Sequence, residues 1–199
     1  MIEKISNYVT DTLIQGDIIK EEERNLYLYC VEGLVETVGN LFFTVLLGIL
    51  FGKLIDTIIF LLIFVPVRSL AGGYHAKNGS VCFGVSILLF LSVILMAGYF
   101  QNFFEIIWSV KQYILSCLCI LFFAPVDCIN KRLNSEKKKQ LRIWILGLLI
   151  VISMLYLCMF LYYKWEYCFV ISNCMVLIAT LLAIGYLENM REEKYYSDV

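Results

Sequence analysis

Residues 54–100 read LIDTIIFLLIFVPVRSLAGGYHAKNGSVCFGVSILLFLSVILMAGYF, two long apolar segments joined by a short polar break. An α-helix needs about 20 mainly apolar residues to cross a bilayer, and each segment is close to that length. The break holds His75, the only histidine of the chain, and Cys82 follows seven positions later. The stretch predicts two membrane helices and, between them, a segment with reactive side chains.

The composition of the whole chain agrees with this prediction. Of the 199 residues, 61% are hydrophobic and 17% are charged, against roughly 25% charged residues in soluble domains. The formal net charge is −1, so no strong field favours nucleic acid as a partner. The 8 cysteines do not predict a disulfide framework, which belongs to small secreted domains. We therefore expect an all-α integral membrane protein.

Six segments are apolar and long enough to be transmembrane helices. They are 34–52, 54–70, 81–100, 106–126, 142–163 and 166–187. Tight connections are expected at Gly52–Lys53, Gln101–Asn102 and Tyr163–Lys164. This organisation divides the chain into an N-terminal region (1–33), a six-helix membrane domain (34–188) and a cytoplasmic tail (189–199).

The N-terminal region predicts one or two amphipathic helices. Apolar side chains at positions 2, 5, 8, 9 and 13 recur at helical spacing, and this helix is expected to end near Gly16. Asp17 is a candidate cap for a second helix that carries Ile19 and Tyr29. Two interpretations stay open, because the pair suits either the membrane face or the polar end of the bundle.

The distribution of Lys and Arg predicts the orientation in the membrane. With both termini inside, the inner side holds all of the 16 basic residues except Lys53, Lys111 and Lys164. The polar connections 68–80 and 127–141 then face the cytoplasm, where a free thiol is stable because the compartment is reducing. The run 131-KRLNSEKKKQLR-142, which begins with Lys131 and Arg132, suits an acidic partner or anionic lipid head groups. It equally fits plain positive-inside topology.

Three polar residues interrupt the first apolar segment. Glu32, Glu36 and Asn40 share one helix face. An acidic side chain inside a membrane is costly and marks a substrate contact or a proton path, whereas one at the interface is satisfied by water. We favour the interface for Glu32 and a functional role, such as substrate binding, for Glu36.

Cys82 and His75 form the one Cys–His pair that local sequence brings together. A thiol nucleophile needs a nearby base, but residues i and i+7 of a straight helix lie about 10 Å apart along its axis. The chain must therefore fold back between them, and Gly72-Gly73 and Asn78-Gly79 are turn signals. Ser80 is then a candidate cap for the next helix, with Cys82 in its first turn, where the helix dipole lowers a thiol pKa.

Positive charge adds to this arrangement, because Arg68 and Lys77 suit a thiolate or a bound carboxylate. The alternative is that the histidine is simply solvated and the cysteine simply packs. A zinc site is disfavoured, since it needs three or four ligands and the chain has one histidine. No metal or other cofactor is expected.

The pattern Arg68…Gly72-Gly73-Tyr74-His75-Ala76…Cys82 resembles the accessory gene regulator protein B family of bacterial membrane cysteine endopeptidases. The stretch 124-APVDCINKRL-133 is similar to the second marker of that family. The resemblance covers nearly the whole chain. One departure is Arg132, where the family has the proline of a Lys-Pro pair, and it concerns the shape of this connection rather than the Cys–His pair.

The resemblance implies a fold, a reaction and a partner. In such proteins the cysteine at Cys82 and the histidine at His75 cleave the C-terminal tail of a precursor peptide of the accessory gene regulator D type. An acyl-enzyme thioester then lets the precursor cyclise to a thiolactone or lactone, which becomes a quorum-sensing signal. The family also suggests a homodimer in the bacterial cell membrane. Asp127, Asn130, Asn78 and Ser80 are candidates to orient His75, and Arg68 is a candidate to pair with Glu36 or with an acidic group of the precursor.

The residues alone leave other functions open. A small transporter or export partner would use Glu36, Asn40 and Lys111 to line a path, and a structural membrane subunit needs no reactive group.

Overall fold

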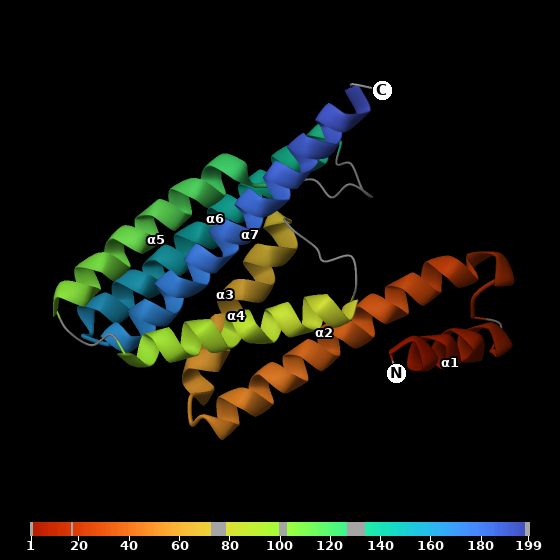
Figure 1. Cartoon of the computed structure of the whole chain (residues 1–199), viewed down its shortest axis with the longest axis horizontal. Helices are drawn as coiled ribbons and strands as arrows, with labels where there is room; N and C mark the ends of the chain where they lie inside the picture. The colour runs from red at the N-terminus through yellow and green to blue at the C-terminus, as the bar shows by residue number, and fades with distance from the viewer. Residues whose placement is uncertain (1, 17, 73–78, 100–102, 127–133, 198–199) are drawn as a thin grey trace.

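A computed structural model describes residues 2–16, 18–72, 79–99, 103–126 and 134–197, and for residues 2, 3, 79–83, 97–99, 103–105, 135 and 192–197 it describes the backbone alone. The described part is built of helices (Figure 1). These are α1 (Ile2–Gln15), the short 3₁₀ helix η1 (Glu21–Glu23), α2 (Arg24–Leu50), α3 (Leu54–Ala71), α4 (Gly79–Tyr99), α5 (Phe103–Phe123), α6 (Ser135–Leu161) and α7 (Trp165–Ser197).

Helix α7 lies at the centre of the bundle. It packs against α3, α4, α5 and α6 (Figure 1). In its apolar stretch 67% of the residues are buried, against 11% in α2. Val170, Ile171, Met175 and Ile178 of α7 have no exposed surface. A helix that is apolar all round belongs in the interior of a bundle, which explains why the last apolar segment of the chain holds the others together.

Five helices of the described part, α2, α3, α5, α6 and α7, are long and apolar enough to cross a membrane. The described apolar stretch of α4, Gly84–Met96, is shorter. Helices α2 to α7 overlap the six segments predicted from the sequence. The described part of the chain is therefore all-helical, and its five long apolar helices fit a multi-pass membrane protein.

Three of these helices extend well beyond their predicted apolar segments. Helix α2 begins at Arg24, α6 begins at Ser135, and α7 continues to Ser197. The boundaries at residue 33 and residue 188 therefore fall inside continuous helices, and residues 135–142 are helical rather than part of a loop. The reason is that hydropathy measures only the apolar part of a helix, whereas Lys, Glu, Gln and Arg continue its hydrogen bonds into water at little cost.

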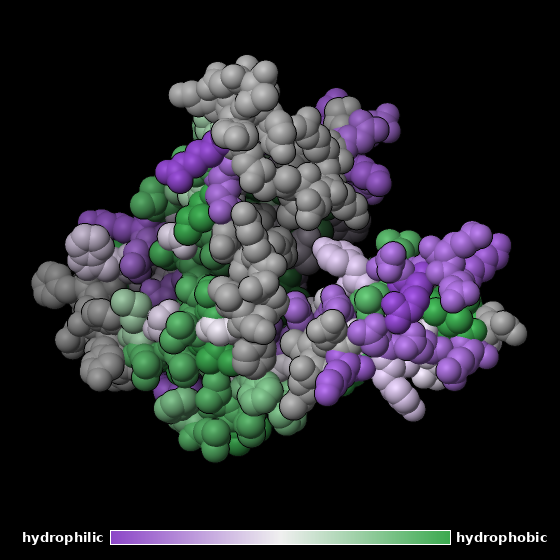
Figure 2. All heavy atoms as spheres, turned by 45° about the vertical axis from the view of Figure 1, so that its right-hand side comes forward, coloured by the Kyte–Doolittle hydropathy of each residue, from purple (hydrophilic) through white to green (hydrophobic). Residues whose placement is uncertain are grey.

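Helix α1 runs beside the first half of α2 and ends directly before Gly16 (Figure 1). Asp17 lies outside the described residues. The guanidinium of Arg24 donates to Asp11 Oδ1 at 2.8 Å and to Asn7 Oδ1 at 3.0 Å. Ser6 and Thr10 of α1 are buried, while its larger apolar side chains are more exposed. Figure 2 shows polar residues gathered on this projecting hairpin and apolar residues over the bundle.

The connections between helices match the predicted turns where they are described. Gly52 has φ +64° and Tyr163 has φ +57°, so the chain reverses at both sites through left-handed backbone. Gln101 and Asn102 lie outside the described residues.

Candidate functional site

The predicted site begins where α3 ends. Helix α3 stops at Ala71, and Gly72 has φ +72°, a conformation that favours glycine. The Gly72 N–H donates to Arg68 O at 3.1 Å, and the Arg68 guanidinium donates back to the Gly72 carbonyl. The first glycine of the predicted turn therefore ends the helix, and Arg68 stabilises that end.

The second marker stretch meets the first at this point. Val126 N–H donates to Ala71 O at 2.9 Å, and Gly72 and Val126 form an isolated parallel bridge. Ala71, Ala124 and Val126 are buried. Two stretches that are 54 positions apart are thus joined backbone to backbone, directly before the residues that carry His75 and Asp127.

Helix α4 supplies the position of Cys82. The helix begins at Gly79, so Cys82 is its fourth residue and lies in the first turn. The first four N–H groups of a helix have no acceptor within it, and they face a bound anion favourably. Ser80 also lies inside this turn, rather than preceding the helix as its cap as the sequence suggested. The helix starts early enough for both residues to belong to it.

The remaining residues of the predicted site lie outside the described part of the chain. Gly73, His75, Lys77 and Asn78 belong to 73–78, and Asp127, Asn130, Lys131 and Arg132 belong to 127–133. The pairing of His75 with Cys82, and the role of every orienting residue, stay predictions.

Helix α2, which carries the predicted polar residues, lies next to α4. The two helices are in contact, and Figure 1 shows the start of α4 crossing the middle of α2. Glu32, Glu36 and Asn40 of α2 are partly buried. Asn40 Oδ1 is buried and has no hydrogen-bond partner among the described residues. The amide oxygen of Asn40 therefore has hydrogen-bonding capacity that no described residue takes up.

The sequence leaves two partners open for Arg68, Glu36 and an acidic group of the precursor, and the second stays a prediction. Arg68 and Glu36 are both described, and no ion pair joins them. The Arg68 guanidinium instead turns back onto its own helix end, at the Gly72 carbonyl.

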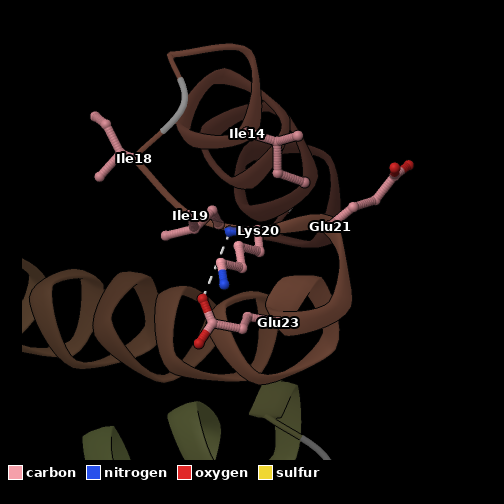
Figure 3. Close-up of a pocket in the computed structure, with 6 residues that line it drawn as sticks. All are labelled: Ile14, Ile18, Ile19, Lys20, Glu21 and Glu23. Carbon is pink, nitrogen blue, oxygen red and sulfur yellow. Dashed lines mark hydrogen bonds between the residues drawn. The ribbon is translucent and has the colours of Figure 1, made fainter.

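A pocket of about 500 Å³ lies elsewhere, at the turn between α1 and α2 (Figure 3). It is lined by Ile14, Ile18, Ile19, Lys20, Glu21 and Glu23. Figure 1 places this turn at the end of the hairpin that is remote from α4. The pocket does not belong to the predicted site.

Potential metal ligands do not cluster in the described part of the chain. Within the described residues, no three His, Cys, Asp or Glu side chains lie together as a metal site requires. Cys30, Cys117, Cys119, Cys158, Cys168 and Cys174 are free thiols.

Sequence reasoning missed one residue of this region. Val126 joins the two markers through its backbone, and a backbone hydrogen bond leaves no signature in residue type. Two features of the sequence could have indicated its role: its position in 124-APV-126, at the start of the second marker, and the paired glycines of the first marker.

Known proteins are similar to this chain over most of its length. The family model of Accessory gene regulator B (AgrB) matches residues 2–185. A putative AgrB-like protein 2 of Clostridium perfringens strain 13 is 26% identical over 145 residues, which cover 70% of this chain and 68% of the relative. The accessory gene regulator protein B of Staphylococcus carnosus is 31% identical over 136 residues, which cover 66% of this chain and 71% of the relative. No solved structure is significantly similar to the chain. The match from residue 2 to residue 185 shows that this chain belongs to the accessory gene regulator B family, whose members take part in processing the quorum-sensing autoinducer from an AgrD-type precursor.

Proposed function

We propose that this protein is a membrane cysteine endopeptidase that cleaves the C-terminal tail of its AgrD-type precursor peptide. The observation that carries the proposal is the family match, which spans both marker stretches. The described backbone supports it in two ways: Cys82 lies in the first turn of α4, and the Gly72–Val126 bridge joins the two markers.

Cys82 is the nucleophile and His75 is the general base and acid. The imidazole takes the proton of the Cys82 thiol, and the thiolate attacks the carbonyl carbon of the scissile peptide bond. The free N–H groups of the first turn of α4 face the oxyanion that forms. When the C–N bond breaks, the imidazolium gives its proton to the leaving amine, and the precursor remains bound to Cys82 as a thioester.

The thioester is the intermediate that permits cyclisation. A thiol of the precursor loses its proton to His75 and attacks the same carbonyl carbon, so that a new C–S bond forms as the Cys82–acyl bond breaks. Exchange of one thioester for another is close to neutral in free energy, whereas forming a thioester from a peptide bond is uphill. The acyl group must therefore be shielded from water until the internal thiol arrives.

The membrane arrangement that goes with this function has six spans. Helix α4 has 21 residues, and at 1.5 Å per residue this corresponds to about 31 Å, the thickness of the hydrocarbon core. The distribution of Lys and Arg supports a cytoplasmic position for the site. We also propose that the protein forms a homodimer. We propose further that the N-terminal hairpin contacts lipid through Ile5, Tyr8 and Val9, which are exposed on α1.

Supporting roles remain for other predicted residues. Asp127, Asn130, Ser80 and Gly73 are proposed to orient His75 or the turn that carries it. Glu36, Lys77, Lys131 and Arg132 are proposed to contact the precursor. Their charges and their place in the chain support these roles.

The test is co-expression with the precursor and mass spectrometry of the products. Cys82→Ala and His75→Gln are each expected to abolish release of the tail, and Cys30→Ala, at an exposed cysteine of α2, is the matched control that keeps it. Cleavage at the normal rate by either site variant would refute the mechanism. Full activity of Cys82→Ser would argue against the thioester, because an alkoxide is far harder to form than a thiolate at neutral pH. A transporter would produce no acyl species on Cys82.

A further inference from the structure

Four residues join the end of α3 to the chain that follows α5, and we call them the α3 clamp: Arg68, Ala71, Gly72 and Val126. Val126 N–H donates to Ala71 O at 2.9 Å, Gly72 pairs with Val126, and the Arg68 guanidinium donates to the Gly72 carbonyl. Ala71 is 0% exposed and Val126 is 5% exposed. The hydrogen bond between them is shielded from water, which otherwise competes for both groups.

The clamp requires glycine at position 72 for two independent reasons. Its φ of +72° is a conformation that other residues adopt at a cost. In addition, a β-carbon at Gly72 would lie 2.4 Å from the Val126 carbonyl oxygen, which is backbone and cannot rotate away. Any larger residue must therefore separate the two stretches.

A second glycine in the chain isolates the effect of the clamp. Gly52 also follows a helix and has φ +64°, but a β-carbon there would meet nothing within 4 Å. Alanine at Gly52 introduces only the strain of a positive φ, whereas alanine at Gly72 introduces strain of that kind and also meets the Val126 carbonyl oxygen.

The clamp lies within both marker stretches, directly before the residues proposed to act as base and as orienting residue. His75 follows Gly72 by three residues along the chain, and Asp127 follows Val126 directly. On the other side, α4 begins at Gly79 and carries Cys82. Two segments therefore start from the clamp. One begins after Gly72 and carries His75, the proposed base, and the other begins after Val126 and carries Asp127, its proposed orienting residue.

We propose that Arg68, Gly72 and Val126 are positioning residues, which act through the clamp to hold His75 in register with Cys82. This inference rests on the proposed function. A displacement of about 1 Å at a reacting group lowers a rate by about 100-fold. We therefore expect loss of the clamp to affect the reaction rate more than the stability of the bundle, which is held together around α7.

The experiment measures alkylation of individual thiols in the full-length protein in detergent micelles, without precursor. Iodoacetamide is added at pH 7, and mass spectrometry follows three cysteines in the same sample. Cys82 reports the environment of the nucleophile, exposed Cys30 is the reference, and Cys174, which is 0% exposed, is labelled when the bundle opens.

In Gly72→Ala, alkylation of Cys82 is expected to slow by about tenfold relative to Gly52→Ala, as the thiolate fraction falls when the base is displaced. Cys30 reacts unchanged and Cys174 stays protected. With precursor added, kcat falls by about 100-fold while KM stays within a factor of three or so, because the groups proposed to bind the precursor remain. Equal Cys82 rates in the two glycine variants would overturn the proposal.

A second pair of variants decides the question if Gly72→Ala exposes Cys174 and so fails to fold. Arg68→Met removes the donor to the Gly72 carbonyl, and Arg68→Lys restores a donor. Slower alkylation of Cys82 in Arg68→Met, recovered in Arg68→Lys, supports the clamp, and equal rates in both contradict it. If the wild-type protein does not cleave the precursor, the proposed function fails, while the thiol measurement still shows whether the clamp controls Cys82.

Discussion

Gly48 of α2 lies so close to Thr57 of α3 that a β-carbon on Gly48 would be 2.1 Å from Thr57 Oγ1. Both residues are buried, and Lys53 N–H donates to Gly48 O at 2.8 Å. The turn between the first two membrane helices therefore depends on close approach of their backbones, the device by which small residues pack helices in a membrane.

Gly48→Ala is expected to lower the free energy of unfolding by about 1–3 kcal/mol, because Thr57 must move to admit the methyl group. The matched control is Gly39→Ala in the same helix, where a β-carbon meets nothing within 4 Å, and it is expected to be neutral or to stabilise by up to about 1 kcal/mol through helix propensity. Thermal unfolding of both variants in one detergent checks this. Equal melting temperatures of the two variants would show that the close contact between Gly48 and Thr57 contributes nothing to stability.

Ser109 of α5 joins three helices through its hydroxyl. It lies 3.0 Å from the Tyr156 hydroxyl of α6, donates to Ser172 Oγ at 3.0 Å, and lies 3.2 Å from Cys168 O of α7. Ser109→Ala is expected to cost about 0.5–2 kcal/mol, since hydrogen bonds between membrane helices contribute this much. Ser92→Ala is the control, because Ser92 is exposed and, among the described residues, its hydroxyl donates to Leu89 O of its own helix. Unfolding in mixed micelles measures the difference, and a Ser109 cost no larger than that of Ser92 would contradict the prediction.

The Arg24–Asp11 ion pair fastens α1 to α2 at 2.8 Å, with side chains that are 34% and 49% exposed. Pairs this exposed contribute less than about 1 kcal/mol and weaken in salt. A double-mutant cycle of Arg24→Met and Asp11→Asn, read out by amide exchange of α1, is therefore expected to give a small coupling free energy that falls further in 1 M salt or so. Lys4→Met, at an exposed position of α1, is the control. A coupling that does not respond to salt would show that the pair is shielded.

Lys137 and Lys139 project from the first turns of α6 and are exposed. If they attract an acidic precursor tail, the double variant Lys137→Gln/Lys139→Gln raises KM by about tenfold with kcat unchanged, because each exposed pair contributes up to about 1 kcal/mol. Lys164→Gln, at the opposite end of α6, is the control for loss of charge. Cleavage kinetics at two salt concentrations test this. An unchanged KM would show that these lysines serve only the positive-inside topology of the membrane helices.

Local sequence predicted the helices well and their ends less well. Apolar length located the segments that became α2 to α7, since burial of a membrane helix depends on its own composition. It placed the start of α6 at residue 142 instead of Ser135, and it did not extend α2 back to Arg24, because charged residues continue a helix without any hydropathy signal.

The candidate site, too, could be predicted from the sequence only in part. The Cys82–His75 spacing and the glycines predicted a break in the helix, and the backbone does end α3 at Ala71 and begin α4 at Gly79. Glu36, one of the two partners that the sequence left open for Arg68, forms no ion pair with it among the described residues, because charge sign does not tell which acceptor lies nearest.

The sequence by itself determined a multi-pass helical membrane protein with two family markers, since helix length, apolarity and short motifs are local properties. Only the tertiary structure decided that Gly72 meets Val126 and that Gly48 meets Thr57. Both contacts depend on how whole helices pack around α7, and the packing of backbone against backbone depends on distances across the fold that residue type does not record.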